Sequence, residues 1–474
     1  KCWKTMKHRA KKVNGWKAMR AAVLVCTAFL LLSCAPAQAQ QNLDSEEIAI
    51  AVRNDLVLDN AVAAHLIDIS VVDGIVTLSG TVDNILAKQR AETLAMHIKG
   101  VRSVVNDIEV LATNREDASI RQDIEDALLL DPVTESIEVD SVVMNGMVTL
   151  TGTVDSWQEK QFCARVAGGV RGVLDVINNI KVATEGDRAD IEIQREVDRR
   201  IEVDAALAAS LIDVSVDDGQ VTISGTVGSA AEKNRAWLDG WVRGVTDVNT
   251  DKLAVEWWAE DETQRISPHA TAADAEIEQA VRDALLYDPR VLSFNPEISV
   301  DNGVVTLRGT VDNLRARNAA GDTALNTMGV WKVNNYLTVR PAVAVADPVL
   351  ADRVRNALAR SVYVDRFDIA VTVLNGKVFL DGAVDSTFEK SFAESVAAGV
   401  PGVVEIDNNL VVSQPLWEPK ADWAIRSDVI DQLIWSPFVD RDQVTVKVED
   451  GEVTLMGTVD TLFERRVAED NAWQ

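Results

Sequence analysis

Apolar and polar side chains alternate over a short stretch of the chain that recurs six times, each time between two glycines six residues apart. In the fourth occurrence the apolar positions are Val305, Leu307 and Val311. A period of two is typical of a strand with one buried face. The glycines of the six pairs are Gly74 and Gly80, Gly146 and Gly152, Gly219 and Gly225, Gly303 and Gly309, Gly376 and Gly382, and Gly451 and Gly457.

A second alternating segment precedes each of these strands, and Asn-Gly or Asp-Gly joins the two. Both residues of such a pair tolerate the positive φ of a tight turn, so the pattern predicts a β-hairpin. The second glycine of each pair lies inside a strand, where glycine is unfavourable, so its recurrence indicates a bulge or another backbone packed close to it. We expect a helix to cross the strand at that point.

An amphipathic helix is predicted before each hairpin, and in the fourth occurrence its stripe of Ile277, Val281 and Leu285 ends at Asp288-Pro289. A second helix is predicted after each hairpin, for example over 88–99. A Gly-Val pair then follows, which we assign as the C-cap, and a third strand comes next with asparagine at or near its start. The Gly-Val pairs begin at Gly100, Gly172, Gly244, Gly329 and Gly402.

Each unit therefore predicts an α+β fold with the order αββαβ, in which a three-stranded mixed sheet carries two helices on one face. Polar or proline-bearing linkers at 259–273, 341–348 and 413–420 favour modules strung like beads. The last unit stops before its third strand and the chain opens on Lys1, so we expect the sequence to continue beyond both ends. The predicted segments are a signal peptide at 1–39 and copies one to six at 45–113, 117–185, 190–258, 273–340, 347–414 and 421–474, the last truncated.

The first residues have the order of a secretory signal, because a basic stretch leads into the apolar run 21–32, which is too short to span a bilayer. Two cleavage sites stay open. Ala37-Gln38-Ala39 fits an A-x-A site, whereas Ser33-Cys34 closes a lipobox in which Cys34 becomes the lipidated first residue. Loss of the eight cations of this segment takes the formal net charge from −27 to −35. Charge alone therefore favours neither nucleic acid nor anionic lipid as a partner.

The sequence predicts no catalytic, metal or cofactor site, and we expect a protein that is not an enzyme. No two of the four histidines have metal-ligand spacing. The glycines lie at turns and within strands rather than before a helix, which argues against a phosphate loop. Acidic pairs such as Asp217-Asp218 fall at hairpin turns. Cys163 lies on a helical pattern, where we expect a buried small hydrophobe.

The tryptophans are the main feature beyond the repeat. Trp157, Trp237 and Trp241 lie on second helices, where core packing and an exposed patch for lipid or protein are both open. Trp257 and Trp258 are adjacent in a segment that we expect to be extended, so their side chains point opposite ways and both can hardly be buried. They are our first candidates for contact with lipid or a partner, and packing between copies three and four is the alternative.

The stretches Asn-Gly-Val-Val-Thr-Leu-Arg-Gly-Thr-Val-Asp at 302–312 and Gly-Val-x-x-Val-x-Asn-x-Ile-x-Val at 172–182 resemble the BON domain (bacterial OsmY and nodulation). The resemblance spans residues 45–474. It implies an αββαβ fold, an exported periplasmic or outer-membrane location, and roles in phospholipid contact, envelope integrity and osmotic stress. It implies no catalysis. The chain departs from the usual one to three copies, and Gly228-Ser229 in copy three replaces an Asp-containing corner.

Two functions stay open. The first is an envelope scaffold, periplasmic or held at the outer membrane by lipid, which contacts envelope phospholipid or envelope proteins. The second is a periplasmic holdase for unfolded outer-membrane or exported clients, a chaperone-like activity that the resemblance implies for some members. For both we expect neither nucleic acid as a partner nor a transmembrane helix after signal removal.

Overall fold

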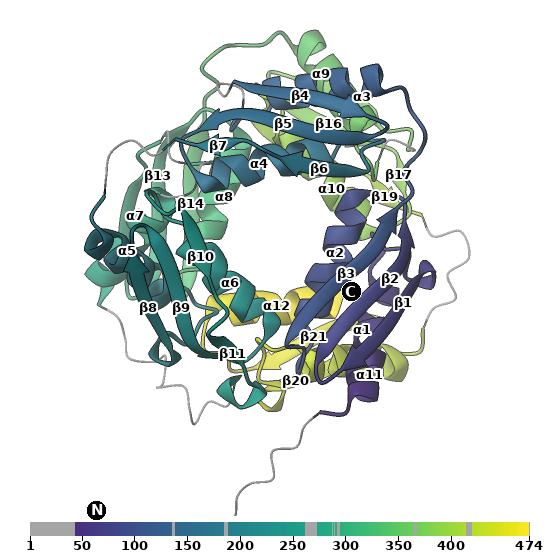
Figure 1. Cartoon of the computed structure of the whole chain (residues 1–474). Helices are drawn as coiled ribbons and strands as arrows, with labels where there is room; N and C mark the ends of the chain where they lie inside the picture. Colours follow the sequence, from purple (N-terminus) through teal and green to yellow (C-terminus); the bar gives the residue numbers. More distant parts are fainter. Residues whose placement is uncertain are drawn as a thin grey trace, which may run out of the picture. The chain divides into compact units, whose positions relative to one another are not determined.

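Every copy begins with a helix, a hairpin and a second helix, and copies one to five add a third strand (Figure 1). This computed structural model describes residues 43–134, 138–183, 188–260, 273–286, 288, 290–291, 294–364, 367–413 and 420–473. The predicted fold class is confirmed, because each complete module is a small mixed sheet with two helices.

The elements of the first three copies follow one another in the same order. Copy one has α1 (Ser45–Leu58), η1 (Ala64–Leu66), β1 (Ile67–Val72), β2 (Ile75–Val82), α2 (Ile85–Met96) and β3 (Ser103–Val110). Copy two has α3 (Asp117–Leu129), β4 (Val139–Met144), β5 (Met147–Val154), α4 (Trp157–Gly168), β6 (Asp175–Asn178) and β7 (Lys181–Val182). Copy three has α5 (Asp190–Val203), η2 (Ala209–Leu211), β8 (Ile212–Asp217), β9 (Gln220–Val227), α6 (Ala230–Gly240), β10 (Asp247–Asn249), β11 (Leu253–Val255) and η3 (Trp257–Glu260).

The last three copies repeat this order with small differences in the third strand. Copy four has α7 (Asp274–Leu286), β12 (Glu297–Asp301), β13 (Val304–Val311), α8 (Leu314–Leu325) and β14 (Lys332–Val339). Copy five has α9 (Asp347–Arg360), β15 (Ala370–Leu374), β16 (Lys377–Asp381), β17 (Ala383–Val384), α10 (Thr387–Ala398), β18 (Glu405–Asn408) and β19 (Val411–Val412). Copy six has α11 (Asp422–Trp435), η4 (Arg441–Gln443), β20 (Val444–Glu449), β21 (Glu452–Gly457) and α12 (Leu462–Trp473).

Copy one shows how the alternation builds a module. β2 is the central strand, antiparallel to β1 and parallel to β3. Its alternate residues Val76, Leu78 and Val82 are buried and pack against Leu56 of α1 and Ala91 of α2. Both helices therefore cover one face of the sheet, as the apolar stripes predict.

An aspartate at the start of the first helix ties that helix to the hairpin turn, a link that the sequence patterns above did not predict. In copy four the carboxylate of Asp274 accepts hydrogen bonds from the backbone N–H groups of Asn302 and Gly303, both at 2.9 Å. These two turn residues have φ of +49° and +73°. Asp117, Asp190, Asp347 and Asp422 make the same pair of bonds in copies two, three, five and six.

We expect Asp274→Ala to lower the stability of copy four by about 1–3 kcal/mol, because two turn N–H groups lose a charged acceptor. Peptide-resolved hydrogen exchange of the full chain would report faster exchange in β12 and β13. Glu278→Ala on the same helix is the matched control, since its carboxylate pairs with the exposed Arg282 one turn away and not with the hairpin turn. Equal effects of the two substitutions would contradict the role of this link.

The expectation of a helix over the second glycine is wrong. The close neighbour is the backbone just before the first hairpin strand: a Cβ at Gly80 would lie 2.1 Å from the carbonyl oxygen of Leu66. Copy four is different, because Pro296 faces Gly309, the ladder stops at Glu297, and a Cβ would meet nothing closer than 3.7 Å. A Cβ at Gly303 would instead lie 2.8 Å from the carbonyl oxygen of Gly329.

The Gly-Val pairs are also not the C-caps that we expected. α2 ends at Met96 with His97 as its C-cap, and Gly100 comes three residues later in a turn with φ of +86°. A Cβ at Gly100 would lie 2.7 Å from the side chain of Leu43 and 3.1 Å from that of Ile48. The glycine is thus required by close packing of this turn against the start of the first helix.

The copies contact one another, which corrects the expectation of separate beads. The residue before the Gly-Val pair donates its backbone N–H to the last carbonyl of the first helix of another copy. Lys99 donates to Trp435 at 2.8 Å, Arg171 to Arg360 at 3.0 Å and Met328 to Val203 at 2.7 Å. These bonds join copy one to six, two to five and four to three, and each satisfies a helix carbonyl that has no partner within its own helix.

Candidate functional site

Three clusters of aspartate, arginine and phenylalanine lie where copies meet. In the first, the guanidinium of Arg90 forms an ion pair with the buried carboxylate of Asp59 and lies 5.8 Å from the ring centre of Phe388 in copy five. The second and third clusters are Asp204, Arg235 and Phe463, and Asp131, Arg315 and Phe162. We call these the Asp–Arg–Phe clusters, in which each arginine is held between a carboxylate and a ring.

The source of the arginine differs among the clusters. Arg90 and Arg235 stand six residues after the N-caps of their second helices, Asn84 and Ser229. Copy two has Phe162 at that place, and Arg315 of copy four supplies the guanidinium to Asp131 instead. The positions of arginine and phenylalanine are therefore exchanged in this cluster, and the charge on Asp131 is balanced by a different copy.

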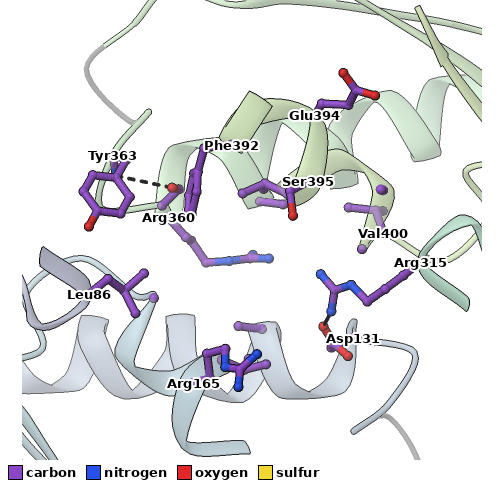
Figure 2. A pocket seen from close by; sticks show the side chains of 18 of the residues that line it. Leu86, Asp131, Arg165, Arg315, Arg360, Tyr363, Phe392, Glu394, Ser395 and Val400 are labelled. Carbon is purple, nitrogen blue, oxygen red and sulfur yellow. Dashed lines mark hydrogen bonds and ion pairs between the residues drawn. The ribbon is translucent and has the colours of Figure 1, made fainter. Parts of the chain in front are cut away.

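A cavity of about 790 Å³ lies between copies one, two, four and five. Six of its lining side chains are arginines and three are acidic, and aromatic rings form part of the wall. Figure 2 shows Arg165, Arg315 and Arg360 extending toward the same space from different helices. The acidic lining residues are Asp131, Asp322 and Glu394.

Arg165 and Arg360 present guanidinium groups to this cavity without a bonded carboxylate. Neither side chain makes a hydrogen bond or an ion pair with a described residue, whereas Arg315 is bonded to Asp131. Burial, together with the nearby charges of Arg290 and Arg315, lowers the pKa of Arg165. Burial also lowers the pKa of Arg360, although Asp123 and Asp126 oppose that shift.

A smaller cavity of about 390 Å³ shares Phe162, Arg165 and Arg290 with the first. Its charges are largely paired. Arg290 is bonded to Asp288 at 2.7 Å and Arg235 to Asp204. Excess positive charge is thus a property of the larger cavity.

The predicted tryptophan sites fall into two groups. Trp157 of copy two stacks on Trp241 of copy three at 5.0 Å and meets Trp237 edge-on at 5.1 Å. All three are partly buried in a contact between copies. Trp257 and Trp258 lie in η3 rather than in the extended segment that we expected, and both are half-buried, so their contact with lipid or a partner stays a prediction.

Two strongly exposed tryptophans were not among the candidate sites that the sequence patterns suggested. Trp423 in the first turn of α11 is 77 % exposed and Trp331 is 54 % exposed. Cys163 is fully buried, as expected, and burial raises its pKa to about 12. Cys34, the predicted lipid attachment residue, lies outside the described residues.

Within the described ranges, no group of three or more metal-binding side chains comes together. None of the helices there combines the length and apolar character needed to cross a membrane.

Comparison with known proteins identifies the family of the six modules. The sequence profile of the BON domain matches residues 44–112, 116–184, 189–256, 273–341, 346–414 and 421–474. The chain belongs to the BON domain family. The six matched BON domains follow one another along most of the chain, and each contains the helix, hairpin and second helix described above.

Two relatives with BON domains share shorter stretches with the chain. It is 29% identical over 143 residues to the osmotically-inducible protein Y of Escherichia coli, which covers 29% of this chain and 71% of the relative. It is 26% identical over 150 residues to the outer membrane lipoprotein DolP of Haemophilus influenzae, covering 31% and 78%. A solved structure of CdsD, a type III secretion protein of Chlamydia trachomatis, covers 47% of this chain and 93% of its own, but at 16% identity and a TM-score of 0.13 it carries no argument.

Proposed function

We propose that this protein is an exported, non-catalytic component of the bacterial cell envelope that contacts envelope phospholipid or envelope proteins and supports envelope integrity under osmotic stress. The match of six BON domains carries the proposal. The relatives named for osmotic induction and for an outer-membrane lipoprotein support the location and the role. The basic and apolar residues at the start of the sequence support export.

We further propose that lipid on Cys34 holds the protein at the outer membrane from within the periplasm. A strongly acidic chain is repelled by anionic lipid, so firm attachment needs acyl chains or inserted aromatic side chains. Trp423 is suited to insertion, because most of its surface is exposed at the start of α11.

We expect radioactive fatty acid to label the expressed wild-type protein. The Cys34→Ala variant should carry no label and should no longer be found in the membrane fraction. Vesicle flotation of the unlipidated protein should show weak binding that Trp423→Ala reduces further, with the half-buried Trp241→Ala as control. Labelling that persists in Cys34→Ala would reject the anchor. Tight, salt-sensitive flotation unaffected by Trp423→Ala would reject aromatic insertion.

A periplasmic holdase is the second candidate function. The open face of the sheet in copy two presents four exposed apolar side chains that an unfolded client could cover, namely Val142, Met144, Met147 and Ile177. Suppression of client aggregation that Met144→Lys abolishes would favour this function over a scaffold. An unchanged rate of aggregation in the presence of the wild-type chain would count against it.

A further inference from the structure

We propose that the larger cavity binds a small anion carrying at least two phosphate groups, held by Arg165, Arg353 and Arg360. The proposal goes beyond the envelope role and does not depend on it. Its starting point is the contrast between a chain of formal net charge −27 and a cavity in which arginines outnumber acids by six to three. The six arginines are Arg90, Arg165, Arg290, Arg315, Arg353 and Arg360.

Half of these arginines already have a carboxylate partner. Arg90 is bonded to Asp59, Arg290 to Asp288 and Arg315 to Asp131. The side chains of the other three make no hydrogen bond or ion pair with a described residue. Three guanidinium groups thus line one cavity without a hydrogen-bonded carboxylate partner.

Such an arrangement is unfavourable in the absence of a ligand. Arg165 faces the like charges of Arg290 and Arg315, and this repulsion disfavours a third cation beside them. The nearest acids to Arg360 on α3, Asp123 and Asp126, act on it through space without a hydrogen bond. A bound polyanion would relieve this repulsion.

The size and the lining of the cavity narrow the ligand. About 790 Å³ lies within the range of roughly 300–1,000 Å³ found for small-molecule sites. The planar guanidinium fork suits phosphate oxygens, which accept two parallel hydrogen bonds. Phe162, Phe392 and Tyr363 offer apolar wall for an organic body between the phosphates. A free phosphorylated solute and a lipid headgroup share this chemistry.

Isothermal titration of the mature chain with pyrophosphate tests the site. We expect binding in the micromolar range that weakens with salt, and a loss of at least tenfold in the double variant Arg165→Gln with Arg360→Gln. Arg121→Gln is the matched control, because this arginine of copy two is exposed and pairs with Glu125 outside the cavity. Arg165→Lys, which keeps the charge but not the fork, should weaken binding less than Arg165→Gln.

Thermal melts separate a binding role from a structural one. Without ligand, Arg165→Gln should melt at the wild-type temperature or above, since a repelled charge is removed, and pyrophosphate should no longer raise its melting temperature. A lower melting temperature with unchanged pyrophosphate affinity would overturn the proposal, as would a lack of pyrophosphate binding to the wild-type chain. Competition by phosphatidylglycerol vesicles would identify a lipid headgroup as the source of phosphate, and its absence a free solute.

Discussion

Gly80→Ala is expected to destabilise copy one severely, by more than about 3 kcal/mol, because the added Cβ would lie 2.1 Å from the carbonyl oxygen of Leu66 and the residue has φ of +116°. Gly80 is paired with Ile67 at the end of the ladder between β1 and β2, and the Leu66 carbonyl directly precedes Ile67, so separating the two atoms would disturb that pairing. Peptide-resolved hydrogen exchange of the full chain should show β1 and β2 exposed.

Gly309→Ala is the matched control in copy four. Its φ of +127° is equally unfavourable for alanine, but the nearest atom to a new Cβ is 3.7 Å away. The expected loss is about 1–2 kcal/mol from the backbone conformation alone. If the two substitutions have the same effect, close approach of the backbone is not the reason for glycine at this place.

The stability of the contact between copies one and six is expected to fall as the pH rises from 4 to 8. Asp55 on α1 is buried beside Asp59, and its pKa is raised to about 7 by burial and by that neighbour, against the opposing effects of Arg90 and a hydrogen bond from Gln432 of copy six. The ordinary pKa of this carboxyl is 3.8. The folded state therefore holds a proton that the unfolded state releases.

The direction of this pH dependence follows from the linkage between proton binding and folding. Because the pKa is higher in the folded state, the stabilising contribution is fully present below pH 4 and is lost as the pH rises through 7. A shift of this size corresponds to up to about 4 kcal/mol between those limits. Asp55→Asn should remove this part of the pH dependence and stabilise the chain at pH 8.

Urea unfolding at pH 5 and pH 8, with Asp352→Asn as an exposed control, measures the difference. Asp131, Glu464 and Asp239 also have raised pKa values and add to the slope, so the test rests on the difference between variant and wild type. An identical pH slope in Asp55→Asn and wild type would show that Asp55 is charged in the folded protein throughout this range.

The elements within each copy follow from local patterns in the sequence. Alternation identifies the buried face of β2, and Asn-Gly or Asp-Gly identifies a turn in which both residues have positive φ. The aspartate link could also have been found, because Asp274 stands 28 residues before Asn302 and the same spacing recurs in four other copies. A repeated polar residue at a fixed distance from a turn is a signal that needs no structure.

The contacts between copies could not be predicted in the same way. Arg90 and Phe388 are far apart in the sequence, and neither differs from an ordinary helix-surface residue. The cavity could not be predicted for the same reason. Arg165, Arg315 and Arg360 belong to three different copies, and nothing in the separate sequences indicates that these side chains come together. Polar linkers also misled the prediction, since a polar connecting sequence does not prevent helix ends of different copies from pairing.

The exchanged positions in the Asp–Arg–Phe clusters set a limit on how the gene can evolve. Recombination between repeats tends to make them alike, yet transfer of the second helix of copy one into copy two would replace Phe162 by arginine. That arginine would face Arg315 across the contact, with a single carboxylate, Asp131, for two cations. We therefore expect duplication or conversion of whole repeats to be selected against here unless a compensating change follows in copy four, so each repeat keeps its place in the order.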